Sequence, residues 1–238
     1  MLRFLCCCCD LGENSERQPL LQPRSARQTC PTPSDSQNEK RIGRLTMRRV
    51  NVPELDQRFT DVAESFNEQQ EHHEAMLQHI RNLKQSWDCT GTDTQNFADC
   101  IKKIRDEQQA TYRISLKMKC YDFSLTVEPV QEEHDEQPLP PNLKLAQDEI
   151  KGLSDSAKAT VSKGTPLQQL ISWMLQGQGQ MAQQVKEAAG TFQEQGRLTA
   201  NLDENIKEVR RAKELSLGYR KVAAEVYNEA AQIAGVCV

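Results

Sequence analysis

The sequence predicts an all-α protein, an elongated helical hairpin or bundle with coiled-coil seams, a disordered N-terminal arm and an acidic, proline-rich linker. Three observations support this prediction. Hydrophobic residues make up 37% of the 238 residues and aromatic residues 5%, while charged residues make up 27%, a balance that favours narrow helical seams over one thick core. Two long stretches repeat apolar residues at helical spacing. Between and before them, residues 128–141 and 1–50 are rich in helix-breaking and polar residues.

Residues 1–50 are expected to form a disordered targeting arm, because residues 10–50 hold many Ser, Pro, Gln and Arg but few large apolar side chains. The arm begins with four contiguous cysteines, Cys6, Cys7, Cys8 and Cys9, behind a short apolar stub. Adjacent cysteines cannot converge on one metal ion. The run is instead typical of S-acylation, and two or more acyl chains give a stable membrane anchor.

An acidic dileucine pattern follows the cysteines. Glu16 stands four positions before the pair Leu20 and Leu21, which is the spacing that clathrin-adaptor complexes read in sorting signals. A cysteine cluster, then an acidic dileucine, then a helical body resembles the N-terminal region of the melanoregulin family. That resemblance implies an acylated protein of late endosomes and lysosome-related organelles.

The end of the arm is basic. Residues 1–50 carry nine Lys and Arg against five Asp and Glu, although the whole chain has a net charge of −4. Five basic residues near the end of the arm are expected to lie close to anionic lipid headgroups. These residues are Lys40, Arg41, Arg44, Arg48 and Arg49. Nucleic acid is not an expected partner, because no aromatic residues or reader motif accompany the basic residues.

Residues 51–127 are expected to form a helical hairpin. Asn51, Pro53 and Glu54 predict the start of its first helix, with Asn51 as the cap. A seam with 4-3 spacing then extends over more than four heptads; it comprises Leu55, Phe59, Val62, Phe66, Gln69, His73, Met76, Ile80, Leu83 and Trp87. Gln69 and His73 place polar groups at its centre, where such residues fix register or oligomeric state.

The end of this hairpin is ambiguous. A helical stripe from residue 94 is followed over residues 112–127 by apolar residues that alternate with polar ones, which is typical of strands. We favour a helix to about residue 118 followed by an extended piece. Residues 128–141 then form an acidic, proline-rich linker.

Residues 142–238 are expected to form a long helical, coiled-coil region. A shorter helix over residues 143–161 precedes a predicted helix start, where Thr165 caps, Pro166 takes the first position and Gln168 completes a capping box. A second seam continues from Ile171 to Val209, with Gln195 as a polar residue inside it, and the stripe resumes to residue 233. One helix over residues 165–234 would be about 105 Å long.

No residue pattern indicates catalysis, a metal site or a cofactor. His73 and Glu74 would need a histidine at position 77 to make a zinc-protease motif, and that position is Leu77. The sequence also lacks a phosphate-binding glycine loop. We therefore expect a protein that is not an enzyme.

The function that the sequence predicts is an S-acylated peripheral membrane adaptor or tether in endosomal and lysosomal trafficking, acting through its coiled-coil helices. It would lie on the cytosolic face of those membranes, with the plasma membrane or Golgi as further locations. Its partners would be the lipid surface, clathrin-adaptor complexes, and helical proteins or a second copy.

Two alternatives remain at this stage. Glu194, Gln195 and Gly196 inside the 171–209 seam resemble the central-glutamine region of the Q-SNARE family, which implies a membrane-fusion component. The other alternative is a self-contained helical bundle with a scaffold role, whose two seams pack on each other.

Overall fold

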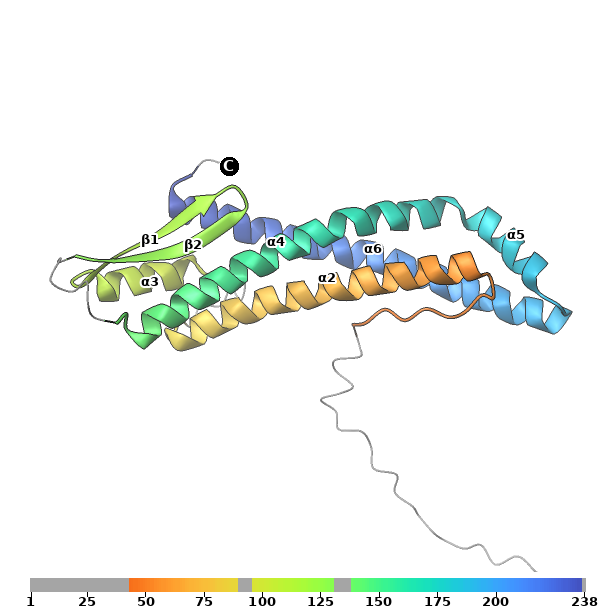
Figure 1. Cartoon of the computed structure of the whole chain (residues 1–238), viewed down its shortest axis with the longest axis horizontal. Coiled ribbons are helices and arrows are strands. Elements are labelled where there is room, and N and C mark those ends of the chain that lie inside the picture. Colours follow the sequence, from red (N-terminus) through yellow and green to blue (C-terminus); the bar gives the residue numbers. More distant parts are fainter. Residues whose placement is uncertain (1–42, 90–95, 131–137, 237–238) are drawn as a thin grey trace, which may run out of the picture.

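A computed structural model describes residues 43–89, 96–130 and 138–236. These residues form α2 (Pro53–Ser86), α3 (Ala98–Gln108), β1 (Tyr112–Lys119), β2 (Asp122–Pro129), α4 (Pro141–Gln176), α5 (Gln178–Ala188) and α6 (Phe192–Ala234). The long helices α2, α4 and α6 extend side by side, with α3 and the β-hairpin at one end and α5 at the other (Figure 1). The prediction of an elongated, all-α bundle is confirmed, with one small hairpin added.

The interior divides into two apolar clusters along the length of the bundle. The hairpin-end core includes Ile80, Phe97, Phe123 and Val226. The α5-end core includes Phe59, Phe66, Ile171 and Leu202. Each cluster takes side chains from α2, α4 and α6, so the bundle buries its apolar surface within one chain.

Helix α2 follows the predicted seam. All ten seam positions are buried except His73, which is half-buried. Its start differs from the prediction, because Val52 occupies the cap position and makes no side-chain cap bond. Asn51 instead has a left-handed φ of 59° and donates from Nδ2 to Glu194 Oε1 at 3.1 Å.

The favoured helix to residue 118 is wrong, and the alternating pattern over residues 112–127 marks strands. Lys119 pairs with Asp122 across a tight turn in which Cys120 has a φ of 55°. Ile114 and Leu116 of β1 and Phe123 and Leu125 of β2 are buried on one face of the hairpin. Helix α4 shields the outer edge of β2, since Phe123 N donates to Ser154 Oγ at 2.9 Å. Strand β2 ends at Pro129, so it includes the first two residues of the predicted linker 128–141.

The predicted helix start at Thr165 is also wrong. Helix α4 continues without interruption from Pro141 to Gln176 with Pro166 inside it. A proline in a helix interior costs about 3 kcal/mol. Packing against α2 on both sides of the proline offsets this cost, because Ile150 and Leu153 precede it and Leu167 and Ile171 follow it in buried positions.

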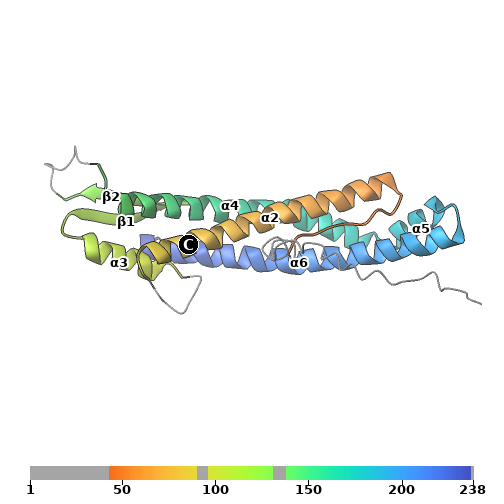
Figure 2. The same cartoon turned by 90° about the horizontal axis from the view of Figure 1, so that it is seen from below.

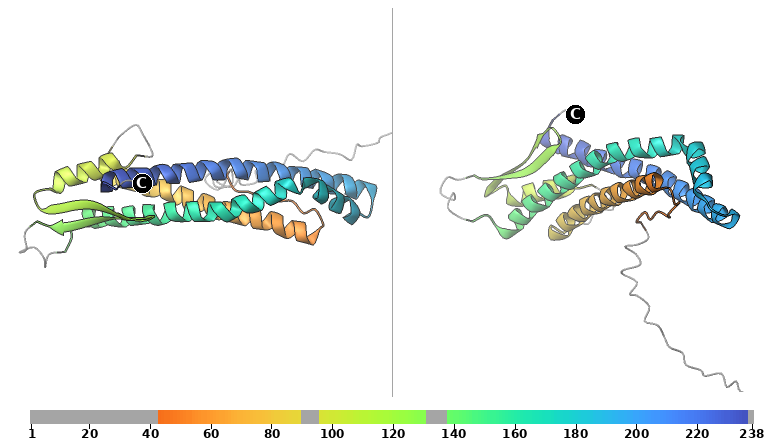
Figure 3. Two further views of the ribbon diagram at one scale, coloured as in Figure 1. Left: turned by 90° about the horizontal axis from the view of Figure 1, so that it is seen from above. Right: turned by 45° about the vertical axis from the view of Figure 1, so that its right-hand side comes forward.

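A single helix over residues 165–234 does not form. The chain bends at Gly177, and between Ala188 and Phe192 it turns back, so that α5 packs against α6 at the end of the bundle (Figure 3). Thr191 Oγ1 accepts from Glu194 N at 3.2 Å, and Glu194 Oε2 accepts from Gly190 N at 3.0 Å. This capping arrangement starts α6. Phe192, which falls within the predicted seam from Ile171 to Val209 and fits its spacing, is 89% exposed.

The N-terminal arm ends earlier than predicted. Residues 43–52, called the strap from here on, are extended chain that packs on the bundle. Leu45 is 2% exposed and Val50 is fully buried, and both belong to the α5-end core. The predicted disordered segment 1–50 therefore includes part of the folded body.

Candidate functional site

The strap lies between α2 and α6 (Figure 2). Asparagine side chains of both helices bind its backbone. On α2, Asn67 Oδ1 accepts from Leu45 N at 2.8 Å, and Asn67 Nδ2 donates to Leu45 O at 3.1 Å. One carboxamide thereby satisfies both backbone groups of Leu45. Because a buried backbone group without a partner costs free energy, these bonds allow Leu45 to insert into the core.

Helix α6 repeats the same arrangement three residues further along the strap. Asn205 Oδ1 accepts from Arg48 N at 2.8 Å, and Asn205 Nδ2 donates to Arg48 O at 2.7 Å. Asn205 is only 1% exposed. Asn201 Nδ2 donates to Arg49 O at 2.8 Å, and Arg211 donates to Gly43 O at 3.1 Å.

The strap carries three of the five predicted membrane-facing basic residues. The side chains of Arg44, Arg48 and Arg49 are exposed while the strap backbone is held. Arg44 forms an ion pair with Glu71 of α2. Lys40 and Arg41 lie outside the described residues.

The acylation and sorting motifs also lie outside the described residues. These are Cys6, Cys7, Cys8 and Cys9, and Glu16, Leu20 and Leu21. Their roles stay predictions. Along the part of the chain that the structure describes, no helix is both long and apolar enough to cross a bilayer.

A polar layer separates the two cores near the middle of the bundle. The predicted polar seam residues Gln69 and His73 both belong to it. Gln69 Nε2 donates to the backbone oxygen of Thr160 on α4 at 3.0 Å, whereas Gln69 Oε1 has no hydrogen-bond partner among the described residues. Beside them, Arg220 of α6 donates to Gln168 Oε1 of α4 at 2.6 Å.

His73 completes this layer by stacking on Tyr219 of α6, with ring centroids 4.3 Å apart. Burial lowers the pKa of His73, and nearby Glu74 partly opposes that shift. Burial also raises the pKa of Tyr219, with a further contribution from Glu74 and an opposing one from Arg211. The layer is therefore suited to neutral rings rather than to a charged imidazole.

Gln195 is not part of this layer. It lies in the first turn of α6, half-exposed, immediately after the chain reversal. Met181 and Val185 belong to α5 while Leu202 belongs to α6. The 171–209 seam is therefore divided among three helices, and the residues upstream and downstream of Gln195 do not form one continuous helical face.

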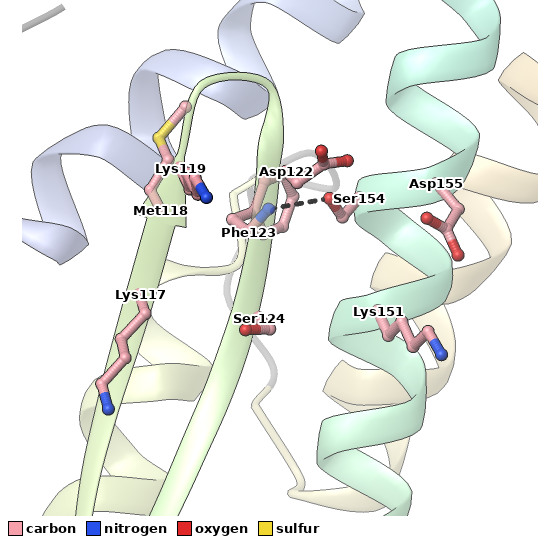
Figure 4. Close-up of a pocket in the computed structure, with 9 residues that line it drawn as sticks. All are labelled: Lys117, Met118, Lys119, Asp122, Phe123, Ser124, Lys151, Ser154 and Asp155. Carbon is pink, nitrogen blue, oxygen red and sulfur yellow. Dashed lines mark hydrogen bonds between the residues drawn. The ribbon is translucent and has the colours of Figure 1, made fainter.

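A pocket of about 390 Å³ lies between the β-hairpin and α4. Two of its lysines do not converge, because Lys117 on β1 and Lys151 on α4 extend away from each other (Figure 4). Lys117 pairs with Glu128 at 3.2 Å, and Asp122 accepts from Lys158 at 2.7 Å. Among the described residues, no three His, Cys, Asp or Glu side chains are grouped so as to hold a metal ion.

Sequence patterns alone did not identify the strap, or the asparagines of α2 and α6 that bind it, as a site. Leu45 and Val50 are too few to stand out in a polar arm, and Asn205 resembles any polar residue on a helix. The paired hydrogen bonds of Asn67 join residues 22 positions apart, and those of Asn205 join residues 157 positions apart.

Comparison with protein-family models, curated protein sequences and solved structures gives no match. No relative therefore supplies an activity for this chain.

Proposed function

We propose that the protein is an S-acylated peripheral membrane adaptor or tether on the cytosolic face of endosomal and lysosomal membranes. The observation that carries the proposal is the run Cys6–Cys9 at the start of an arm that leads to a helical bundle. Acyl chains on two or more of these cysteines would hold the protein at a bilayer. The acidic dileucine at Glu16, Leu20 and Leu21 would select the organelle through clathrin adaptors.

The attachment of the strap supports a tethering role. Residues 10–42 can span at most about 120 Å between the cysteines and the bundle. A load on the anchor would pass through the strap, whose Leu45 and Val50 are buried in the core. The strap would therefore transmit that load from the anchor to the core of the bundle.

The basic residues of the strap support contact with anionic lipid. Arg48 and Arg49 are exposed and contribute about 1 kcal/mol each when they lie close to an anionic surface. Arg44 contributes less while it pairs with Glu71. Electrostatic contact of this size assists an acyl anchor but does not replace it.

The packing of the two seams limits how the bundle would bind partners. Its two seams bury their apolar residues within the chain, so an adaptor built on it would bind partners through another surface. The same observation favours the self-contained bundle with a scaffold role as the second candidate. A Q-SNARE-like function needs one continuous helix around Gln195, and the chain reversal between Ala188 and Phe192 does not support it.

Membrane fractionation tests the anchor. Changing Cys6–Cys9 to serine should move the protein from the membrane pellet to the cytosol and remove hydroxylamine-sensitive acylation. The control is Cys120→Ser, which changes an exposed cysteine at the hairpin turn and should leave the protein in the pellet. Persistent pelleting of the four-serine variant would overturn the proposal.

A second variant tests the sorting signal separately. Leu20→Ala with Leu21→Ala should leave acylation and pelleting unchanged but shift the protein away from endosomal and lysosomal markers in microscopy. An unchanged organelle distribution would show that the dileucine is not used.

A further inference from the structure

We propose that Cys89 and Cys100 form a redox-active pair, which a low-molecular-weight disulfide such as oxidised glutathione converts into a reversible Cys89–Cys100 disulfide. Cys89 lies just after the end of α2, and Cys100 lies in the first turn of α3. Both are free thiols. The inference rests on this end of the bundle alone and does not depend on membrane attachment.

The packing of α3 beside the end of α2 brings the two thiols together. A side-chain hydrogen bond links Cys100 with Cys89. Cys100 is fully buried in the hairpin-end core, and Cys89 packs against the same core. Lys103, one helical turn after Cys100 and on the same face of α3, donates from Nζ to the backbone oxygen of Asp88 at 3.2 Å. Separate contacts therefore place this face of α3 against residues 88 and 89.

Little in the structure would have to change for the disulfide to form. Thiols that are already neighbours can be bridged without large backbone movement, and only ten residues separate the two cysteines in the sequence. Cys89 Sγ donates to the backbone oxygen of Trp87 at 3.5 Å. This bond would be lost, but a thiol is a weak donor.

The surroundings of the two thiols set the order of reaction. Cys89 is partly exposed, so a small disulfide can reach it, whereas Cys100 is buried. Burial, followed by the hydrogen bond with Cys89, raises the pKa of Cys100 to about 12, and the charge of Lys84 partly opposes that shift. Since the thiolate is the attacking form, Cys89 reacts first and Cys100 second.

The oxidation proceeds by two thiol–disulfide exchange steps. Cys89 loses its proton to water, and its thiolate attacks one sulfur of oxidised glutathione, which forms a mixed disulfide and releases a glutathione thiolate. Cys100 then loses its proton to water, and its sulfur attacks Cys89 Sγ, which releases the second glutathione thiolate. Each released thiolate takes up a proton. The two cysteines thus lose two electrons, and one oxidised glutathione becomes two reduced molecules.

Mass spectrometry of the full chain tests the inference. The folded protein is incubated with oxidised glutathione, its remaining thiols are alkylated in urea, and trypsin then leaves both cysteines in the peptide 85–102. We expect this peptide to lose two hydrogen atoms and to take up no alkyl group, and dithiothreitol to restore both thiols. Alkylation of both cysteines would overturn the inference. Glutathione retained on Cys89 beside an alkylated Cys100, or a link from Cys89 to another cysteine, would also overturn it.

Thermal melting of two matched variants gives a second readout. A disulfide that closes a short loop restricts the unfolded chain, so oxidation should raise the melting temperature of the wild type by about 5–10 °C. Cys120→Ser, which changes an exposed thiol at the hairpin turn, should show the same rise, and Cys89→Ser should show none. Equal shifts in all three proteins would overturn the inference. If Cys89→Ser does not fold, the digest of the wild type decides alone.

Discussion

His73 of α2 and Tyr219 of α6 stack with ring centroids 4.3 Å apart and an angle of 21° between their planes. This pair joins two helices at the level where the apolar core is interrupted. His73 Nδ1 is buried and has no hydrogen-bond partner among the described residues. The contact therefore depends on an imidazole that stays neutral.

Acid should weaken the bundle through His73. Burial holds its pKa in the folded state below the ordinary value of 6.5, so the unfolded chain binds a proton first as the pH falls. Stability is then fully present above pH 6.5 and declines below it. Tyr219 stacks on the ring, and the charge of Glu74 partly opposes the lowering of the pKa.

Urea denaturation between pH 8 and pH 5 measures this effect. His73→Phe keeps a ring against Tyr219 but cannot titrate, so its free energy of unfolding should fall less below pH 6.5 than that of the wild type. Equal pH slopes for the two proteins would contradict the assignment.

Replacing Gln69 by leucine should stabilise the protein by about 1 kcal/mol, because it removes a buried oxygen without a partner. The oxygen of Thr160 stays in the helical ladder of α4. Gln69→Ala should instead destabilise by about 2 kcal/mol, since it leaves a cavity. Thermal melting of both variants checks the pair, and a lower melting temperature for Gln69→Leu would show that its hydrogen bond to Thr160 dominates.

Two glycines should respond to alanine in opposite directions. A Cβ on Gly152 would stand 2.3 Å from His79 Cε1, and His79 is held by Glu149 at 2.6 Å. We expect Gly152→Ala to cost about 1–3 kcal/mol through overpacking. Gly218 has open space around it, so Gly218→Ala should add about 1 kcal/mol of helix stability. Chemical denaturation measures both, and stabilisation by Gly152→Ala would refute the close packing at His79.

Thr191→Ala should cost about 1 kcal/mol, the usual contribution of a helix cap. Its control is Thr165→Ala, at an exposed position inside α4 where no cap is needed. That control should be neutral or slightly stabilising. Melting curves compare the two, and an equal effect at both positions would show that Thr191 does not stabilise the start of α6.

Periodicity predicted burial well but did not predict where the chain reverses. The seam from Leu55 to Trp87 is long enough for its spacing to specify a helix, and α2 follows it. Phe192 fits the spacing of the second seam, yet it follows the cap Thr191 and is exposed. The pair Thr191 and Glu194 was available in the sequence as a capping signal, but the apolar stripe across it suggested continuity.

Other features depended on contacts that the sequence does not specify locally. Thr165 and Gln168 on either side of Pro166 predicted a helix start. Packing against α2 instead keeps α4 continuous through the proline. The strap was predicted as part of a disordered arm because the residues that hold it are distant in the sequence. Asn67 lies 22 positions from Leu45, and Asn205 lies 157 positions from Arg48. The polar centre of the first seam was predicted at Gln69 and His73, but its partners on α4 and α6 were not.

The long separation between the strap and α6 has a consequence for the order of synthesis. Asn201, Asn205 and Arg211 leave the ribosome more than 150 residues after the strap that they hold. The strap therefore cannot dock fully until translation is nearly complete. An acyltransferase that acts during translation would meet Cys6–Cys9 before the bundle is complete. Membrane anchoring would then precede docking of the strap on α6.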